Sequence, residues 1–299
     1  MAGAVGFFTD TTICIGCKAC QVACHQWNDL PAEGLQAPAG HRRSLPVLSG
    51  NSYDNTGSFS DVNWRHVKFI EQPRQGSERV AWLMMSDVCK HCVNAPCLEV
   101  CPTSAILRTE FDTVYINEPA CNGCRDCVTA CPFGVIHMSM ARGVAQKCTF
   151  CYDRLQNGLT PSCAQACPTG SIAFGKVDEL KRKARERLAQ LQRERDQDGR
   201  PVWPKAKLYG EDDKVLGGLN SFYLLVDEPE TYGLPANPKV PSRAVPPSSL
   251  WSVLTAIMTG LGVLFAFRGR TGVVSRDADS AERSAGTASR SAPQTPPRG

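Results

Sequence analysis

Apolar and polar residues alternate in several short segments, a pattern that predicts half-buried β-strands. The clearest alternation runs over residues 64–70, and a short apolar run follows at residues 80–85. Two more apolar segments, residues 105–108 and 113–116, are separated by a short turn and predict a β-hairpin. Residues 221–226 form a further predicted strand. The pattern therefore predicts a fold with several short strands.

Residues 176–197 are rich in charge, and their apolar residues recur at helical spacing. On one helical face these residues form a stripe: Val177, Leu180, Ala184, Leu188 and Leu191. The segment is predicted to be an amphipathic surface helix whose stripe packs on the protein, in preference to a basic helix that binds a partner. A Pro/Gly-rich stretch follows at residues 199–247.

Residues 250–267, LWSVLTAIMTGLGVLFAF, carry no charge over 18 positions, which is the lower limit for crossing the core of a bilayer. Trp251 stands where an interfacial anchor is expected, and Arg268 and Arg270 close the far end. The segment predicts a single transmembrane helix, with a buried helix of a soluble protein as the alternative.

Basic residues around this segment predict its orientation. The 20 residues after it contain four arginines: Arg268, Arg270, Arg276 and Arg283. The 20 residues before it contain only Lys239 and Arg243. The positive-inside rule then predicts a cytoplasmic tail, with the rest of the chain on the outer face of the cell membrane. Residues 268–299 are rich in Ser, Ala, Arg and Pro and predict a disordered tail.

Composition and charge exclude some classes of protein. The 33 basic and 29 acidic residues give a net charge of +4, which is too balanced to indicate binding to nucleic acid. The first 13 residues lack the features of a secretory signal and contain no twin-arginine pair, so any export is expected to depend on another chain. Residues 31–63 are rich in Gly, Pro, Ser and Asn and predict a long surface loop that a partner orders.

Cysteine carries most of the chemical information. The chain has 16 cysteines in four groups of four, and small disulfide scaffolds rarely reach this length. Groups one and three have the spacing C-x2-C-x2-C-x3-C, which bacterial ferredoxins use to bind pairs of 4Fe-4S clusters. Groups two and four keep the x3 ending and lengthen one gap. In chain order the groups are Cys14, Cys17, Cys20 and Cys24; Cys89, Cys92, Cys97 and Cys101; Cys121, Cys124, Cys127 and Cys131; and Cys148, Cys151, Cys163 and Cys167.

The ferredoxin spacing has a physical reason. Three thiolates on one tight loop reach three irons of a cube, while the fourth, at the start of a new segment, points to the neighbouring cube. The last cysteine of groups two, three and four begins a repeated Cys-Pro-x-x-x-Ile signature, whose isoleucine is expected to cover a cluster with apolar surface. The four groups therefore predict four 4Fe-4S clusters with no cysteine left over.

Zinc and disulfide bonds are the alternatives to iron and sulfide. Thiolates also suit zinc, but zinc sites usually take their ligands as two pairs across a spacer. A disulfide framework would make the ferredoxin spacing a coincidence. Spacing alone allows two exchanges of the fourth cysteine: group one with two and three with four, or group one with four and two with three. The short stretch of 19 residues between Cys101 and Cys121 favours the second.

Other motifs carry less weight. Residues 170–176, GSIAFGK, resemble a phosphate-binding loop, but Val177 replaces the required Ser or Thr, so nucleotide binding is not predicted. His91 is expected to lie beside a cluster or on the surface rather than to bind metal. No arrangement of catalytic residues is found. Basic residues in or beside the cysteine groups are expected either to raise cluster potentials or to face solvent: Lys18, Lys90, Arg125 and Lys147.

Residues 14–31, CIGCKACQVACHQWNDLP, resemble the first cysteine group of the iron-sulfur (beta) subunit of membrane-bound formate dehydrogenase. The resemblance covers residues 10–267, including residues 53–55, the later cysteine groups, and residues 206–210 and 230–235. Related four-cluster, ferredoxin-like subunits of molybdopterin oxidoreductases, and of hydrogenases, share the cysteine framework. The formate assignment depends on the first group and on the Tyr-Gly-Leu-Pro sequence at residues 232–235.

This resemblance implies an electron-transfer subunit without catalytic residues. It would relay electrons from a molybdopterin-containing catalytic subunit of formate dehydrogenase to a membrane cytochrome b subunit or a quinone. The resemblance also implies four ligand sets for the clusters: Cys14, Cys17, Cys20 and Cys167; Cys89, Cys92, Cys97 and Cys131; Cys121, Cys124, Cys127 and Cys101; and Cys148, Cys151, Cys163 and Cys24.

The expected fold class is α+β, with two ferredoxin-like dicluster halves and one C-terminal transmembrane helix. Four parts are expected along the chain. Residues 1–175 form the four-cluster domain, with the loop at 31–63 inserted in it, and residues 176–249 form the helix and the Pro/Gly-rich extension. Residues 250–267 span the membrane, and residues 268–299 form the tail.

Overall fold

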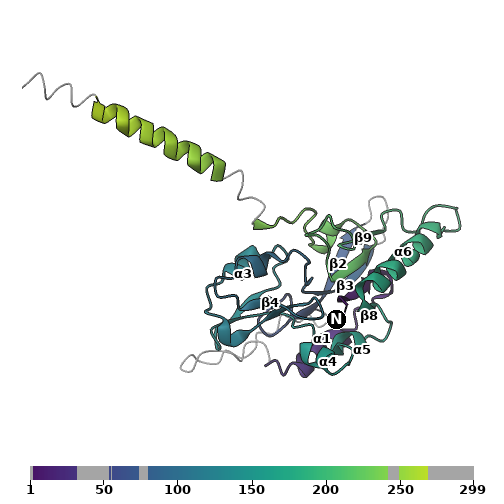
Figure 1. Cartoon of the computed structure of the whole chain (residues 1–299). Helices are drawn as coiled ribbons and strands as arrows, with labels where there is room; N and C mark the ends of the chain where they lie inside the picture. The colour runs from purple at the N-terminus through teal and green to yellow at the C-terminus, as the bar shows by residue number, and fades with distance from the viewer. Residues whose placement is uncertain (1–2, 32–53, 55, 74–79, 242–248, 269–299) are drawn as a thin grey trace, which may run out of the picture. The chain divides into compact units, whose positions relative to one another are not determined.

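The computed structural model describes residues 3–31, 54, 56–73, 80–241 and 249–268 (Figure 1). The chain divides into two units, Met1–Ser242 and Arg243–Gly299. The first unit contains all the cysteines and all the strands of the described residues. The described residues of the second form one helix, Ser249–Arg268.

A four-stranded sheet organises the first unit. Its strands lie in the order β8-β1-β10-β9, in which β1 and β10 are parallel and the outer strands are antiparallel to their neighbours. β10 confirms the strand predicted at residues 221–226, whereas the other three strands were not predicted. Their bounds are β1 Val5–Asp10, β8 Ile172–Lys176, β9 Lys207–Tyr209 and β10 Ser221–Leu225.

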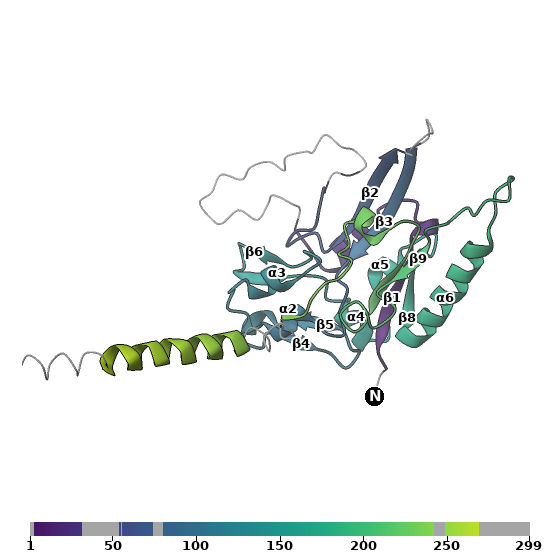
Figure 2. The ribbon, with the colours of Figure 1, turned by 90° about the horizontal axis from the view of Figure 1, so that it is seen from above.

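Helix α6, Val177–Arg193, covers one face of this sheet, and Figure 2 shows it alongside β8 and β1. It confirms the predicted amphipathic helix, although it ends four residues before residue 197. Four residues of the predicted stripe are buried, and Leu188 is partly buried against them. On the same face Arg187 forms an ion pair of 3.0 Å with Asp10. On the opposite face, the ring of Phe7 stacks on Phe150 with centroids 4.1 Å apart.

Three antiparallel strand pairs account for the other strands in the described residues of the first unit. The pair β2–β3 confirms the strand predicted at residues 64–70, and the pair β4–β5 confirms the hairpin predicted at residues 105–108 and 113–116. The apolar run at residues 80–85 lies in β3, and the pair β6–β7 was not predicted. The bounds are β2 Arg65–Pro73, β3 Val80–Val88, β4 Ile106–Arg108, β5 Val114–Ile116, β6 His137–Ser139 and β7 Val144–Gln146.

Short helices follow or connect the cysteine loops. Helix α1 packs against α5, and α2 packs against α3, so cysteine group one lies with group four and group two lies with group three. This arrangement confirms two ferredoxin-like halves in an α+β fold. The helices are α1 Ala19–Trp27, α2 Pro96–Glu99, α3 Asp126–Ala130, α4 Tyr152–Gln156 and α5 Ser162–Gln165, with 3-10 turns η1 Thr11–Ile13, η2 Glu118–Ala120 and η3 Pro229–Tyr232.

The remaining sequence predictions have mixed outcomes. Residues 172–176 of the segment that resembles a phosphate loop form strand β8. The described part of the predicted loop, residues 31, 54 and 56–63, contains no helix or strand, while residues 32–53 and 55 lie outside the described residues. The predicted tail also lies outside them, apart from Arg268. Helix Ser249–Arg268 matches the predicted transmembrane segment, and its side chains are exposed.

Candidate metal centres

Groups one and three each begin on a tight loop that leads into α1 or α3. In group one, Gly16 and Lys18 have positive φ angles of 65° and 61°. In group three, Gly123 and Arg125 at the matching positions have φ angles of 74° and 72°. Two residues with left-handed backbone in so short a loop bend it tightly. At Gly16 and Gly123 this conformation has no steric penalty, because glycine lacks a Cβ atom.

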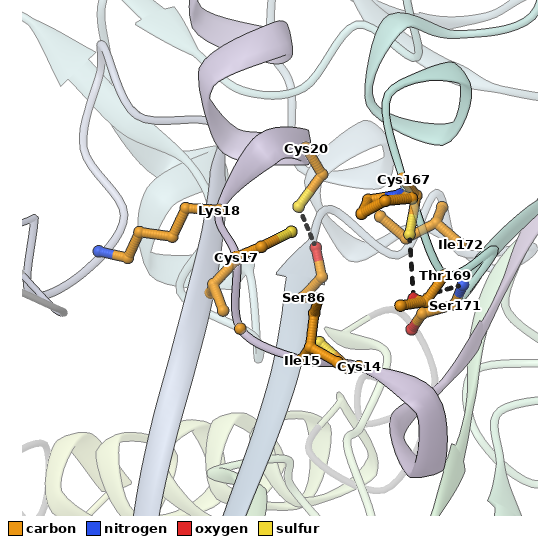
Figure 3. Close-up of a pocket in the computed structure, with 13 residues that line it drawn as sticks. Cys14, Ile15, Cys17, Lys18, Cys20, Ser86, Cys167, Thr169, Ser171 and Ile172 are labelled. Atoms are coloured by element: carbon orange, nitrogen blue, oxygen red, sulfur yellow. Dashed lines mark hydrogen bonds between the residues drawn. The ribbon is translucent and has the colours of Figure 1, made fainter.

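Four cysteines line the first cavity, whose empty space of about 300 Å³ is partly open to solvent. Cys14 and Cys17 come from the loop before α1, Cys20 comes from the first turn of α1, and the fourth cysteine follows the end of α5. Figure 3 shows Cys17 and Cys20 facing Cys167 across the hollow. The Sγ atom of Cys20 lies 3.1 Å from the hydroxyl of Ser86. The members of this first quartet are Cys14, Cys17, Cys20 and Cys167.

The loop of the first quartet packs against β2 and β3 at Gly16, which leaves no space for a side chain at this position. A Cβ atom at this position would lie 2.6 Å from Cε1 of Phe69 and 2.7 Å from Sδ of Met84. Its left-handed backbone adds strain of about 1 to 2 kcal/mol for any other residue. We expect Gly16→Ala to displace the loop and to lower the iron content, measured per chain after anaerobic purification.

Gly158→Ala is the matched control for this prediction. Gly158 has a similar φ of 69°, but no atom lies within 4 Å of its added Cβ. It should suffer only the backbone strain and keep its iron. Equal iron content and equal melting temperature in the two variants would contradict the proposed role of the contact with Phe69 and Met84.

Two more cavities are each lined by four cysteines. The first of them lies beside α2 and has about 320 Å³ of empty space, and the other lies beside α3 and has about 310 Å³, each partly open to solvent. In each cavity three cysteines come from one group and the fourth from the other group of the same half. The second quartet is Cys89, Cys92, Cys97 and Cys131, and the third is Cys121, Cys124, Cys127 and Cys101.

The remaining four cysteines lie together between α1, α4 and α5. Burial raises the pKa of the Cys24 thiol well above its usual value, and the neighbouring thiols of Cys148, Cys163 and Cys151 raise it further. The backbone N–H of Phe150 donates to the Sγ atom of Cys148 over 3.3 Å. The fourth quartet is therefore Cys148, Cys151, Cys163 and Cys24.

Burial opposes ionisation of several of these thiols. It raises the pKa of Cys97 and Cys148 to about 12, and that of Cys127 and Cys163 to about 11. All sixteen cysteines are free thiols in the structure. Four thiolates can share one such cavity only when a bound metal group supplies compensating positive charge.

The donor sets fit an iron-sulfur cube better than a single ion. Within the described residues, no group of three or more His, Cys, Asp or Glu side chains is placed to hold one metal ion. Around Cys101, burial opposes the charged form, but backbone hydrogen bonds from Ile106, Thr103 and Ala105 outweigh it and hold the pKa below its ordinary value. Sulfur atoms that surround a cavity and accept N–H bonds suit a cluster, in which each thiolate binds a different iron.

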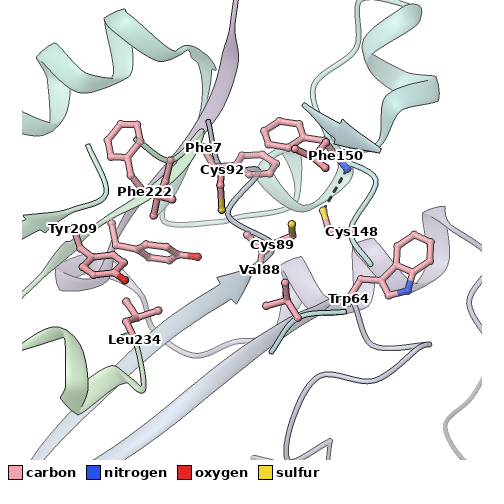
Figure 4. Close-up of a cluster of buried hydrophobic side chains, with 14 of the residues drawn as sticks. Phe7, Trp64, Val88, Cys89, Cys92, Cys148, Phe150, Tyr209, Phe222 and Leu234 are labelled. Carbon is pink, nitrogen blue, oxygen red and sulfur yellow. Dashed lines mark hydrogen bonds between the residues drawn. The ribbon is translucent and has the colours of Figure 1, made fainter. Parts of the chain in front are cut away.

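Neighbouring quartets also approach one another. Burial is the main cause of the raised pKa of three thiols, and in each case a thiol of another quartet adds to it: Cys20 acts on Cys163, Cys89 on Cys148, and Cys127 on Cys97. The quartets therefore follow one another in the order first, fourth, second, third. Figure 4 shows Cys89 and Cys148 together inside the buried cluster of apolar side chains.

The basic residues near the cysteines differ in environment. Lys90 and Lys147 are buried, so the alternative that they face solvent is wrong for both. Lys90 forms an ion pair with Asp87, whereas Lys147 donates to the carbonyl oxygens of Val114 and Cys148, 2.5 and 2.9 Å away.

The other two basic residues lie nearer the surface. Arg125 is exposed, which fits the solvent-facing alternative. Lys18 pairs with Asp54 over 3.5 Å.

His91 is fully buried beside the second quartet, and its Nδ1 atom accepts from the backbone N–H of Val114 over 3.0 Å.

Sequence reasoning missed two residues at the quartets, one that contacts a cysteine and one that contacts the first. Ser86 contacts Cys20, and Arg65 is a buried cation that donates to Ser86 over 2.9 Å. The available signal was the alternation in the predicted strand, which places Arg65 on the same inward face as Val67. Both side chains are only 1% exposed.

Comparisons with known proteins agree with this geometry. Residues 13–105 and residues 80–177 match two families that are both described as 4Fe-4S dicluster domains. The iron-sulfur subunit of the nitrate-inducible formate dehydrogenase of Escherichia coli is 33% identical over 264 residues, which are 87% of this chain and 81% of that protein. The formate dehydrogenase-O iron-sulfur subunit of the same organism is 34% identical over 86% of this chain and 79% of its own length.

A further relative serves a different enzyme. The thiosulfate reductase electron transfer subunit PhsB of Salmonella typhi is 40% identical, over 57% of this chain and 74% of its own length. The fold, the thiol quartets and these matches define an iron-sulfur protein of the ferredoxin-like dicluster class, which binds 4Fe-4S clusters. The chain belongs to the family of iron-sulfur subunits of formate dehydrogenase, whose members transfer electrons and are not the catalytic chains.

Proposed function

We propose that the chain binds four 4Fe-4S clusters, one in each quartet, and carries electrons between a molybdopterin-containing formate dehydrogenase catalytic subunit and a membrane cytochrome b subunit. The observation that carries this proposal is the set of four thiol quartets, in which a thiol of one quartet influences a thiol of the next in the order first, fourth, second, third. Each bound cluster takes up and releases one electron. The protein holds the clusters in line and sets their potentials through burial and nearby charge.

The ends of the row differ from its middle. Cys17 in the first quartet and Cys124 in the third are exposed, whereas all four cysteines of the fourth quartet are buried. Apolar side chains wall the cavities, including Ile172 at the first and Ile106 and Ile116 at the third. This arrangement supports entry and exit of electrons at opposite ends and insulation from water between them.

Formate is the favoured substrate of the catalytic partner because of the extent of the similarity. The two formate dehydrogenase subunits of Escherichia coli match 86 to 87% of this chain, whereas the thiosulfate reductase subunit matches 57%. Service to another molybdopterin oxidoreductase is the second candidate, which the 40% identity of that shorter match supports.

The helix Ser249–Arg268 supports attachment to the cell membrane by a single span. Within the part of the chain that the structure describes, it is the one helix long and apolar enough to cross a bilayer. The four arginines at residues 268–283 support a cytoplasmic tail, with the iron-sulfur unit on the outer face.

Anaerobic purification of the complex tests the proposal. We expect brown protein with about sixteen irons per chain, since each of four cubes holds four. Paramagnetic signals should appear with formate as well as with dithionite. Signals with dithionite alone would assign the chain to another catalytic partner. Colourless protein containing zinc, or protein without acid-labile sulfide, would overturn the proposal.

A further inference from the structure

Arg65 is a cation enclosed in the protein core. It is the first residue of β2, its side chain is 1% exposed, and its guanidinium lies 5.1 Å from the centre of the Phe7 ring. Its Nη1 atom donates to the hydroxyl of Ser86 over 2.9 Å. Among the described residues, no carboxylate forms an ion pair with it. Its positive charge is therefore not neutralised by an acidic side chain there.

Two of its donor atoms lack acceptors. Nε and Nη2 of Arg65 are buried and have no hydrogen-bond partner in the described residues. A buried charged donor without an acceptor is strongly destabilising, so such a group is retained where something else accepts its hydrogen bonds. Sulfur atoms of a bound cluster carry the negative charge that these donors need.

The surroundings of Arg65 identify which sulfur atoms are close. Burial raises the pKa of the thiols around it, and the guanidinium opposes this effect at Cys20 of the first quartet. It acts in the same way on three members of the fourth quartet: Cys24, Cys148 and Cys163. The hydroxyl of Ser86 contacts both Arg65 and Cys20. Arg65 thus lies at the junction of the first and fourth quartets.

We propose that Arg65 is a positioning and tuning residue that donates N–H bonds to sulfur at the junction of these two quartets and raises the reduction potentials of both clusters. The inference rests on the proposed function, because it requires clusters in these quartets. A reduced cluster carries one more negative charge than an oxidised one. A fixed cation and N–H donors therefore stabilise the reduced form, and they do so more strongly in a dry interior than in water.

Redox titration of the intact complex, followed by electron paramagnetic resonance, tests this role. Arg65→Met keeps the volume and removes the charge. In this variant, the equilibrium between reduced and oxidised cluster should shift at least tenfold toward the oxidised form at two clusters. For a one-electron couple, a tenfold shift lowers the reduction potential by 59 mV. The signals of these two clusters are those lost in Cys14→Ser and in Cys163→Ser. The signals of the second and third quartets should keep their potentials.

Two further variants keep the test decisive. Arg187→Met removes a cation that pairs with Asp10 on the opposite face of the sheet, and it should leave every potential unchanged. Arg65→Lys keeps the charge but loses the fork of donors, so it should lower the same two potentials by less than Arg65→Met does. If Arg65→Met binds no iron, the test depends on Arg65→Lys. Unchanged potentials at both clusters in Arg65→Lys would then overturn the inference.

The outcomes separate this inference from the proposed function. Unchanged potentials in Arg65→Met with full iron content would show that the arginine only supports the fold. Absence of iron and sulfide in the wild-type chain would instead refute the proposed function. A shift of only one potential would overturn the shared role of Arg65 between the two quartets.

Discussion

Serine in place of Cys24 is expected to remove the same cluster as serine in place of Cys163, although the two residues belong to the first and last cysteine groups. Both lie in the fourth quartet, where burial and the neighbouring thiols raise the pKa of Cys24. A serine hydroxyl is a poor substitute for a soft thiolate. The iron content should fall by about a quarter, since one cube of four is lost.

Cys20→Ser is the matched control for this prediction. Cys20 lies one helical turn from Cys24 in α1 but lines the first cavity. Electron paramagnetic resonance of the reduced complex should show one signal missing from both Cys24→Ser and Cys163→Ser, and a different signal missing from Cys20→Ser. Loss of one common signal from Cys20→Ser and Cys24→Ser would mean that each cysteine group binds its own cluster.

The same variants test the order of the quartets. The fourth quartet lies between the first and the second, since Cys20 is close to Cys163 and Cys89 is close to Cys148. Losing its cluster should stop electron transfer along the row while both ends still accept electrons. In Cys163→Ser, formate should reduce the cluster nearest the catalytic subunit without reducing the cytochrome.

Local chemistry was readable from the sequence because it depends on neighbouring residues. The cysteine spacing predicted the loops, and the alternation at residues 64–70 predicted β2. The placement of the quartets was not readable in this way, because it depends on contacts between distant segments. Group one joins group four through the packing of α1 against α5, and spacing alone had allowed another pairing.

The central sheet illustrates the same limit. β1 is a six-residue strand near the start of the chain, and its parallel partner β10 begins at Ser221. A parallel pair has no turn signal that links its strands.

Arg65 was missed for a related reason: a charged residue at the start of a strand usually faces water, and only the folded chain shows that it lies between two quartets.

Charged residues placed in the apolar helix Ser249–Arg268 are expected to abolish membrane attachment. Met258→Arg combined with Leu261→Arg puts two charges near the centre of Ser249–Arg268. Each arginine costs about 2.5 to 3.5 kcal/mol at the centre of a membrane helix, so the pair costs roughly 6 kcal/mol. This is enough to abolish insertion of a segment that only just reaches spanning length. After carbonate washing of membranes, we expect the wild-type chain in the pellet and the double variant in the supernatant.

Ser249→Arg is the control, because a charge at the end of the helix can reach the polar interface. It should remain in the pellet. The double variant should keep its full iron content, since all sixteen cysteines lie in the other unit of the chain. Release of the wild-type chain by carbonate, or retention of the double variant, would show that this helix is not the anchor. Loss of iron together with release would indicate instead that the two units depend on each other for folding.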